Sequence, residues 1–233
     1  DASKEIPGWA EAGLDITEAG QGHKAWFPVS TVEFSKEVLT GQGSGKVTEI
    51  EEVKPQSIFV TAQGHTVIDF GQNMSGHVQV TADGKAGDVI QLHCFEALDT
   101  KGEVYLENLR TAKETSTYVY GKDGRITYKS SFTYMGFRYV LIEKFPGEPK
   151  CENFTGILVS SDLKPTGKLK TGHTLLNRFF ENVLWGQRDN FLDIPTDCPQ
   201  RDERHGWTGD AQAFVRTACL NYDVEKFVKK WNK

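Results

Sequence analysis

The chain has 233 residues, of which 38% are hydrophobic and 25% are charged, and its net charge at pH 7 is −5. No run approaches the roughly 20 apolar residues that a membrane-spanning helix needs, which argues against a membrane role. Acidic and basic residues are interspersed, so the sequence offers no positive surface for nucleic acid and this class of partner is excluded. The length suits one large domain or two of ordinary size, and the pattern of elements favours two.

Residues 1–45 are predicted to be the end of a preceding module followed by a flexible linker. Trp9 and Trp26 lie beside proline or glycine and could each anchor a core or an interface, and the segment ends in the glycine-rich run 41–45. The polar start, Asp1 to Glu5, lacks the character of a secretory signal. A chain that begins with Asp is expected to be a processed or excised piece.

Residues 46–165 are predicted to form an antiparallel β-sandwich. Short runs of β-branched and aromatic residues are separated by turns rich in Asp and Gly, and about eight strands without intervening helices are typical of sandwiches. The expected strands are 58–62, 65–70, 76–82, 89–96, 115–120, 125–130, 137–143 and 154–160. Six aromatic residues at strand spacing are interpreted as core or cross-strand pairs rather than as a sugar-binding surface, namely Tyr118, Tyr120, Phe132, Tyr134, Phe137 and Tyr139.

Residues 166–233 are predicted to be helical. Apolar residues recur at helical spacing from Leu175 to Leu184, which predicts a helix over 173–189 with Thr171 as its cap. Two further helices are expected at 210–220 and 224–231, with Thr208 and Asp223 as caps. Three helices with wide apolar faces cannot enclose a site alone, so they are expected to belong to a larger domain and to make the isolated chain self-associate.

The stretch Asp197–Asp210 carries the densest chemistry of the chain. It holds four carboxylates, two arginines and a tryptophan, and Pro199, Gly206 and Gly209 predict a loop rather than a continuous helix. An indole face beside carboxylates and guanidinium groups is typical of carbohydrate subsites. Glycoside hydrolysis also needs two acids, one protonated and one ionised, and the stretch can supply the first. The alternative is a set of ion pairs that only hold the loop.

No metal site is predicted. The four cysteines, at 94, 151, 198 and 219, show neither zinc spacing nor a disulfide framework and are expected to be free thiols. Cys198 is interpreted as a packing residue, with a nucleophilic thiol activated by His205 as the alternative. A calcium site in the sandwich is a further alternative, although no loop has EF-hand spacing; its oxygen ligands would come from Asp69, Asn73, Glu96 and Asp99.

The string DCPQRDERHGWTGDAQAF at 197–214 resembles the signature of the bacterial α-L-rhamnosidases, glycoside hydrolase family 78. Three upstream strings extend the resemblance, which covers roughly residue 45 to the end of the chain: IDFGQNMSG at 68–76, FTYMGFRY at 132–139 and NFLDIPT at 190–196.

This resemblance implies a jelly-roll-like β-sandwich followed by an (α/α)6 barrel, of which the chain holds only the first helices. The chain is accordingly expected to be mainly β with a C-terminal α segment and an incomplete barrel. The family's general base, a Glu that activates water, is expected beyond residue 233, so the isolated chain is expected to be inactive. Inversion of the anomeric centre is implied by the family alone.

The family pattern assigns Glu203 as the general acid that protonates the glycosidic oxygen. A protonated carboxyl group at working pH needs burial or nearby negative charge, which Asp197, Asp202 and Asp210 could provide. Asp197 and Asp210 match positions that hold the rhamnose hydroxyls and tune the acid.

Trp207 matches a ring that lines the sugar subsite, and Arg201 matches a charged group beside it. Asp202 and Arg204 are interpreted as structural. His205 stands where the family often has an apolar residue, and it is assigned no role.

The predicted function is release of terminal, non-reducing α-L-rhamnose from glycosides or polysaccharides by an inverting general acid/base mechanism. The resemblance implies no metal and no organic cofactor. Two alternatives stay open: a non-catalytic carbohydrate-binding module that recognises rhamnose, and an (α/α)6 glycosidase of another specificity. Rhamnose-containing glycans are the expected partners, and the family points to the bacterial cytoplasm or periplasm.

Overall fold

A computed structural model describes residues 29–41, 43 and 45–232, and the chain falls into two compact units, 1–41 and 42–233. In the first unit, η2 (Lys36–Val38) is one 3-10 turn, and its Glu37 amide donates a 3.4 Å hydrogen bond to the Ser35 hydroxyl. Trp9 and Trp26 lie outside the described residues, so their anchoring roles stay predictions.

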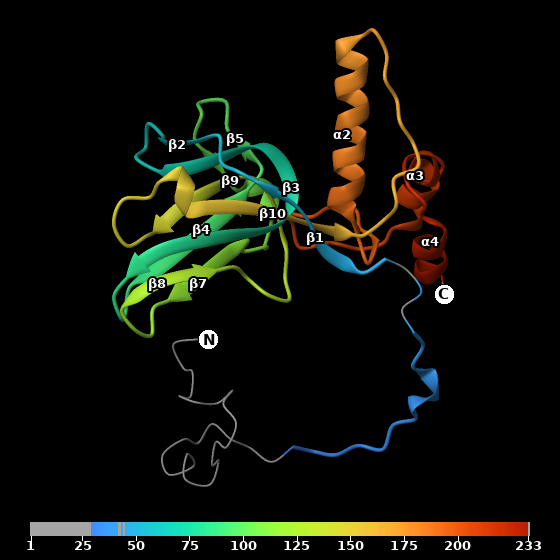
Figure 1. Ribbon diagram of the computed structural model, residues 1–233, viewed down its shortest axis with the longest axis horizontal. Helices are drawn as coiled ribbons and strands as arrows, with labels where there is room; N and C mark the ends of the chain where they lie inside the picture. The colour runs from blue at the N-terminus through green and yellow to red at the C-terminus, as the bar shows by residue number, and fades with distance from the viewer. Residues whose placement is uncertain (1–28, 42, 44, 233) are drawn as a thin grey trace. The chain divides into compact units, whose positions relative to one another are not determined.

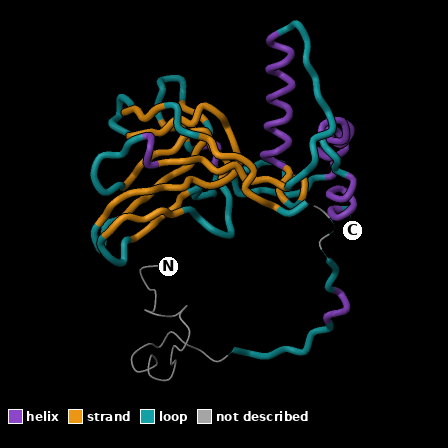
Figure 2. Tube along the Cα trace, in the orientation of Figure 1, coloured by secondary structure: helices purple, strands orange, loops and turns teal. Residues whose placement is uncertain are grey.

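The second unit is built mainly on an antiparallel sheet of eight strands (Figures 1 and 2). The strands pair in the order β1-β10-β3-β9-β4-β7, and β2 and β8 also pair with β3. A small hairpin of β5 (Ala97–Leu98) and β6 (Val104–Tyr105) stands apart from this sheet. The predicted antiparallel, mainly β class is therefore confirmed. The eight strands are β1 (Val47–Val53), β2 (Ser57–Val60), β3 (Thr66–Gly84), β4 (Val89–Phe95), β7 (Thr115–Val119), β8 (Gly124–Tyr128), β9 (Met135–Lys144) and β10 (Phe154–Ser161).

Strand β3 joins the whole sheet because it changes partners along its 19 residues. Its first part pairs with β2 and β9, and its second part pairs with β10 and β8. The sequence predicted two strands here, at 65–70 and 76–82, and assigned residues 71–75 to neither. The structure instead absorbs these residues in a bulge, where the register with β9 shifts between Asp69 and Met74.

The core of the sheet is made by the aromatic and aliphatic residues of alternating strand positions. Phe137 is fully buried and packs edge-on against Phe70, and the Tyr120 hydroxyl donates a 2.9 Å hydrogen bond to the Ala82 carbonyl. The predicted core role of the strand aromatics therefore holds for these residues. It is wrong for Phe132, whose side chain is fully exposed.

Three helices follow the sheet, as predicted: α2 (Thr174–Asn190), α3 (Thr208–Asn221) and α4 (Glu225–Trp231). A two-residue hairpin, β11 (Phe191–Leu192) with β12 (Ile194–Pro195), leads from α2 into the loop before α3. The predicted apolar face of α2 is largely uncovered, because Leu175 and Phe179 are 74% and 64% exposed. Within the part of the chain that the structure describes, no helix has the length and apolarity to cross a membrane.

The predicted helix caps were wrong. The N-cap of α2 is His173, whose Nδ1 accepts a 3.3 Å hydrogen bond from the Leu176 amide, whereas Thr171 bonds to the Asn177 side chain. Thr208 is the first residue of α3 and not its cap. Asp223 lies one residue before Val224, the N-cap of α4, although its Oδ1 accepts a 3.4 Å hydrogen bond from the Glu225 amide. A hydroxyl or carboxylate near a helix start therefore does not by itself identify the N-cap residue, which the local backbone conformation determines.

The C-terminal end of α2 is fixed to the sheet by polar contacts. The buried Asp189 carboxylate accepts a 3.0 Å hydrogen bond from the Ser75 amide of β3, and the Ser160 hydroxyl of β10 donates to the Arg188 carbonyl at 2.7 Å. Burial raises the pKa of Asp189 to about 7, and the Ser75 amide opposes this rise only in part.

The raised pKa makes the stability of the chain depend on pH through Asp189. The protonated form stabilises the fold fully below the ordinary pKa of 3.8, and this contribution is lost as pH rises through about 7. Asp189→Asn is expected to be more stable than wild type at pH 8, by on the order of 2–4 kcal/mol, with the gap closing near pH 4. Urea unfolding of both chains at the two pH values measures it, and an unchanged gap would contradict the assignment. The exposed Asp83→Asn is the control and should shift stability by less than about 0.5 kcal/mol at either pH.

Candidate active site

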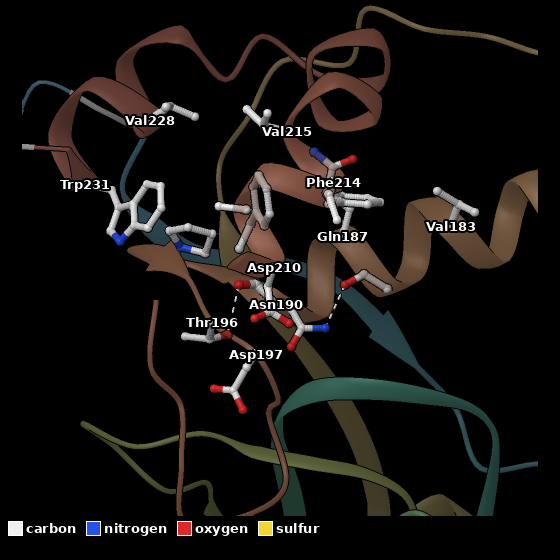
Figure 3. A pocket seen from close by; sticks show the side chains of 15 residues that line it. Val183, Gln187, Asn190, Thr196, Asp197, Asp210, Phe214, Val215, Val228 and Trp231 are labelled. Atoms are coloured by element: carbon white, nitrogen blue, oxygen red, sulfur yellow. Dashed lines mark hydrogen bonds between the residues drawn. The ribbon is translucent and has the colours of Figure 1, made fainter. Parts of the chain in front are cut away.

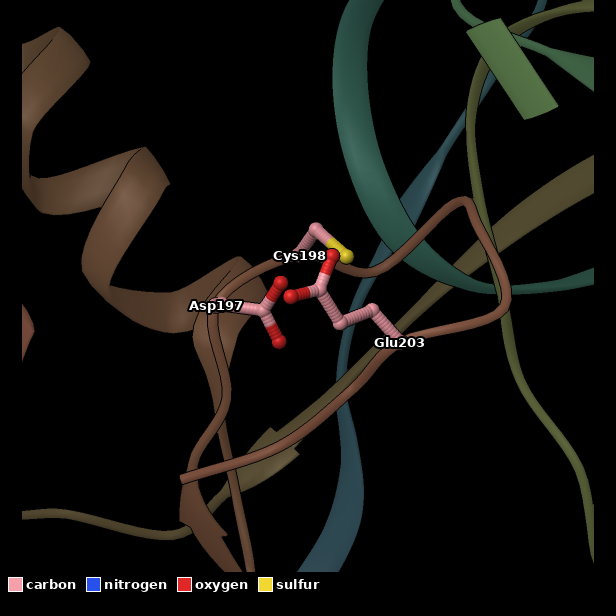
Figure 4. Close-up of side chains that lie close together, drawn as sticks. All are labelled: Asp197, Cys198 and Glu203. Atoms are coloured by element: carbon pink, nitrogen blue, oxygen red, sulfur yellow. The ribbon is translucent and has the colours of Figure 1, made fainter. Parts of the chain in front are cut away.

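The loop 196–207 is folded back on itself between β12 and α3. The Thr196 hydroxyl and amide both donate to the Asn190 carbonyl, which fixes the start of the loop. Further along, the Asp197 amide donates to the His205 carbonyl, and the His205 amide donates to Asp197 Oδ1 at 2.8 Å. This closure brings Asp197 and Glu203 together across the loop, as Figure 4 shows.

Glu203 is surrounded by hydrogen-bond donors. Its Oε2 accepts from Arg201 Nε at 3.1 Å and from Arg110 Nη1 at 3.0 Å, and its Oε1 accepts from Trp207 Nε1 at 3.0 Å. The side chain is 22% exposed. The sequence predicted carboxylates as its neighbours, but two guanidinium groups hold the closest positions, an arrangement that suits a carboxylate.

Arg201 bridges the two carboxylates of the loop. Besides Glu203, it contacts Asp197, whose Oδ2 lies 3.3 Å from Arg201 Nη2. Burial by itself raises the pKa of Asp197, but hydrogen bonds from the Cys198 thiol and the His205 amide, together with Arg201, hold it below its ordinary value. Asp197 is therefore a buried, ionised acceptor, as a residue that holds sugar hydroxyls would need to be.

Asp197, Cys198 and Glu203 also form a group that could hold a metal ion, with ligand atoms within 4.8 Å of one another. The Arg201 guanidinium already contacts both carboxylates, so the positive charge that a metal would supply is in place. Burial raises the pKa of the Cys198 thiol, which disfavours the thiolate that zinc binding or nucleophilic attack requires. The packing role predicted for Cys198 fits this geometry better than the nucleophile alternative, and all four cysteines are free, as expected.

The residues of the calcium alternative do not converge on one point. The Asp69 carboxylate makes a two-pronged ion pair with Arg138, with both distances 2.9 Å. Asn73 donates to Glu96, and Asp99 accepts from the backbone of its own turn. The oxygens of these side chains therefore make separate local contacts and do not surround a common cation site.

Three consecutive residues of the loop are each held by the segment 110–114 of the sheet domain. Thr111 donates to Asp202, Arg110 pairs with Glu203, and Arg204 Nη2 lies 2.6 Å from Glu114 Oε1. The predicted structural roles of Asp202 and Arg204 agree with these contacts. Arg110 and Glu114 were missed, because they lie some 90 residues upstream in a segment with no recognisable motif.

The segment 110–114, which holds the loop, has an unusual backbone conformation at two of its residues. Arg110 and Glu114 have φ values of +57° and +42°, a region that side chains with a Cβ rarely adopt. Glu114 is buried, and burial raises its pKa to about 7 despite the neighbouring Arg204. The Arg204 guanidinium in turn lies 4.3 Å from the centre of the Tyr134 ring, which adds a cation–π contact.

Gly136 of β9 lies close against the backbone of the loop. Its amide donates to Glu114 Oε2 at 3.1 Å, and a Cβ at this position would lie 2.7 Å from the Gln200 nitrogen and 2.8 Å from the Pro199 carbonyl carbon. The absence of a side chain at Gly136 therefore sets the distance between the sheet and the loop.

A cavity of about 450 Å³ lies on the helical side of the loop (Figure 3). Asp197 and Asp210, both predicted to bind the sugar, line it together with the polar Asn190. Its remaining wall is mostly apolar and includes Phe214 and Trp231, neither of which was predicted as a site residue. Trp207 does not line this cavity; its ring is 50% exposed and lies beside His205.

The fold and the loop together define a class of protein: a β-sheet module joined to the helices of a glycosidase-type domain, with acidic and aromatic residues at the junction. Two family models match the chain. The bacterial alpha-L-rhamnosidase concanavalin-like domain matches residues 59–160, and the bacterial alpha-L-rhamnosidase 6 hairpin glycosidase domain matches residues 164–233. The chain belongs to the bacterial α-L-rhamnosidase family.

Its relatives support this membership. The α-L-rhamnosidase of Streptomyces avermitilis is 38% identical over 232 residues, which cover 99% of this chain and 22% of that protein. Its crystal structure complexed with L-rhamnose matches with a TM-score of 0.88, again at 38% identity with 99% and 22% coverage. Native α-L-rhamnosidase from Aspergillus terreus matches with a TM-score of 0.89 at 38% identity, with 97% of this chain and 26% of that structure covered. The chain thus spans about a quarter of the length of these relatives.

Proposed function

We propose that this chain is part of an α-L-rhamnosidase that releases terminal, non-reducing α-L-rhamnose from glycosides or polysaccharides. The observation that carries the proposal is the arrangement of Glu203 beside Asp197, with Arg201 between their carboxylates and the Trp207 indole bonded to Glu203. A carboxyl group, a charged hydroxyl-binding group and an aromatic face are the parts that a glycosidase subsite needs.

In this proposal Glu203 is the general acid, and Asp197, Asp210, Arg201 and Trp207 bind the rhamnosyl unit. Because Glu203 is paired with two arginines, we infer that bound substrate changes these pairings so that the carboxyl group can carry a proton to the glycosidic oxygen. The reaction is proposed to invert the anomeric centre, which NMR of the first-formed rhamnose anomer checks.

The proposed division of the chain is a preceding module and linker at 1–45, a β-sandwich at 46–165 and the beginning of the helical catalytic domain at 166–233. No residue of this chain is assigned the general base, so we propose that the 233-residue chain alone is inactive. The exposed apolar residues of α2 are proposed to contact further helices in the longer protein and to cause self-association of the isolated chain.

The test is hydrolysis of 4-nitrophenyl α-L-rhamnoside by the full-length enzyme that carries this sequence, assayed beside the 233-residue chain. Release of rhamnose by the first and not by the second is expected. Rhamnose binding without turnover by the full-length protein would favour the carbohydrate-binding alternative, and turnover of a different aryl glycoside would favour another specificity.

Trp207 allows stacking to be separated from its hydrogen bond to Glu203. Trp207→Ala in the full-length enzyme is expected to weaken rhamnose binding about tenfold while folding stability falls by less than about 1 kcal/mol, because the ring is half exposed. A core tryptophan would instead cost about 3–5 kcal/mol. Rhamnose titration and thermal melting of the same samples measure both effects. Trp207→Phe is the matched variant: it should keep most of the binding, and equal losses in the two variants would assign the effect to the indole N–H.

A further inference from the structure

Phe132 is a residue of the sheet domain that neither the core nor the proposed reaction uses. Its side chain is fully exposed, at 109%, and its φ is +60°. This backbone conformation is an outlier for a bulky side chain, and such strain tends to be kept where a function requires it. The turn between β8 and β9 thus presents an aromatic face to solvent in a strained conformation.

A polar cleft of about 350 Å³ lies beside the turn that carries this phenylalanine, although Phe132 itself is not part of its lining. Its two sequence neighbours, Ser131 and Thr133, line the cleft, and so do Ser116 and Ser130, whose hydroxyl oxygens lie 2.9 Å apart. The volume is in the range of small-ligand sites. An exposed aromatic edge with several hydroxyl groups suits a sugar ring, which has both apolar C–H faces and hydroxyls.

The cleft and the helical cavity are lined by different residues of the loop that carries the proposed general acid. Arg204, which follows Glu203 directly, lines the cleft with its partner Glu114, whereas Asp197 and Asp210 line the cavity. A general acid protonates the oxygen between the departing group and the sugar that is released, so these two units lie on either side of it.

We propose that this cleft and Phe132 form a subsite for the sugar to which rhamnose is attached, an inference that rests on the proposed function. Phe132 stacks on the apolar face of this leaving-group sugar, and Ser131 and Thr133 bind its hydroxyls. The enzyme therefore prefers substrates in which rhamnose is joined to another pyranose over substrates in which rhamnose is joined to a small leaving group.

The test compares two substrates in the full-length enzyme: an α-L-rhamnosyl-glucose disaccharide and α-L-rhamnosyl fluoride, which carries no leaving-group sugar. The measured quantity is the ratio of their kcat/KM values. Phe132→Ala is expected to lower this ratio about tenfold, and Thr133→Val, which keeps the shape and removes the hydroxyl, about threefold. Val60→Ala removes another exposed apolar side chain, from β2, and is expected to leave the ratio unchanged.

The outcomes separate the two proposals. A ratio that stays constant in both Phe132→Ala and Thr133→Val overturns the subsite. Equal losses on both substrates together with a lower melting temperature in Phe132→Ala also overturn it, because Phe132 would then be a packing anchor for another part of the longer protein. A wild-type enzyme that cleaves neither substrate refutes the proposed function itself.

Discussion

Glu203→Gln is expected to reduce cleavage of sugar-linked rhamnosides by about 10²- to 10⁴-fold, the usual range for loss of a general acid. The loss should be much smaller for aryl rhamnosides with very acidic phenols, because a good leaving group departs without protonation. The amide has nearly the shape of the acid and keeps an oxygen acceptor for the arginines and for Trp207. Steady-state kcat/KM on a series of leaving groups measures the difference.

The pH profile provides a second measurement for the same variant. A general acid loses its proton as pH rises, so the wild-type enzyme should lose activity on the alkaline side, and this alkaline limb should disappear in Glu203→Gln. Asp202→Asn is the matched control, since Asp202 is the adjacent acid and bonds to Thr111. If Glu203→Gln affected good and poor leaving groups equally and kept the alkaline limb, the acid would have to be sought elsewhere, with Asp202 and Asp210 next.

Gly136→Ala is expected to lower kcat/KM by about 10²-fold although the substituted residue touches no substrate. Its new methyl group would sit within 3 Å of the Pro199 and Gln200 backbone and force the loop away from the sheet. A displacement of about 1 Å in a catalytic group can cost about 10²-fold in rate, and the crowding should also lower stability by about 1–3 kcal/mol. Assays well below the melting temperature separate the catalytic loss from unfolding.

Gly121→Ala is the control for this experiment. A Cβ at Gly121 meets nothing within 4 Å, so the variant should keep its activity. Normal kcat/KM in Gly136→Ala would show that the loop tolerates displacement from the sheet, and the proposed dependence of Glu203 on the sheet domain would then be wrong.

The sequence predicted the fold well where local patterns determine it. The strand-like patterns in 89–96 and 154–160 and the apolar repeat in 173–189 predicted β4, β10 and α2. It failed where tertiary pairing overrides local composition. No strand was predicted for residues 71–75, but partners on both sides keep β3 continuous. The short strands β5 and β6 carry too few residues to show a period.

The candidate site was predicted only where its residues lie close together in the sequence. Asp197, Arg201 and Glu203 lie within seven residues, so one motif and one loop could bring them together. Arg110 and Glu114 reach the same place only through the fold, and their left-handed backbone has no glycine to signal it. The guanidinium neighbours of Glu203 therefore could not be inferred from the carboxylate-rich string around it.

The contacts between 110–114 and 202–204 bear on how such an enzyme can be recombined. The sheet domain supports the loop of the proposed active site, because Thr111, Arg110 and Glu114 each contact one of three consecutive loop residues. A chimaera of two relatives with its crossover near residue 165 would place one parent's arginine against the other parent's acid. Both halves could fold, yet the crossover would separate residues that contact one another, so crossovers outside the interval 110–204 are the safer choice.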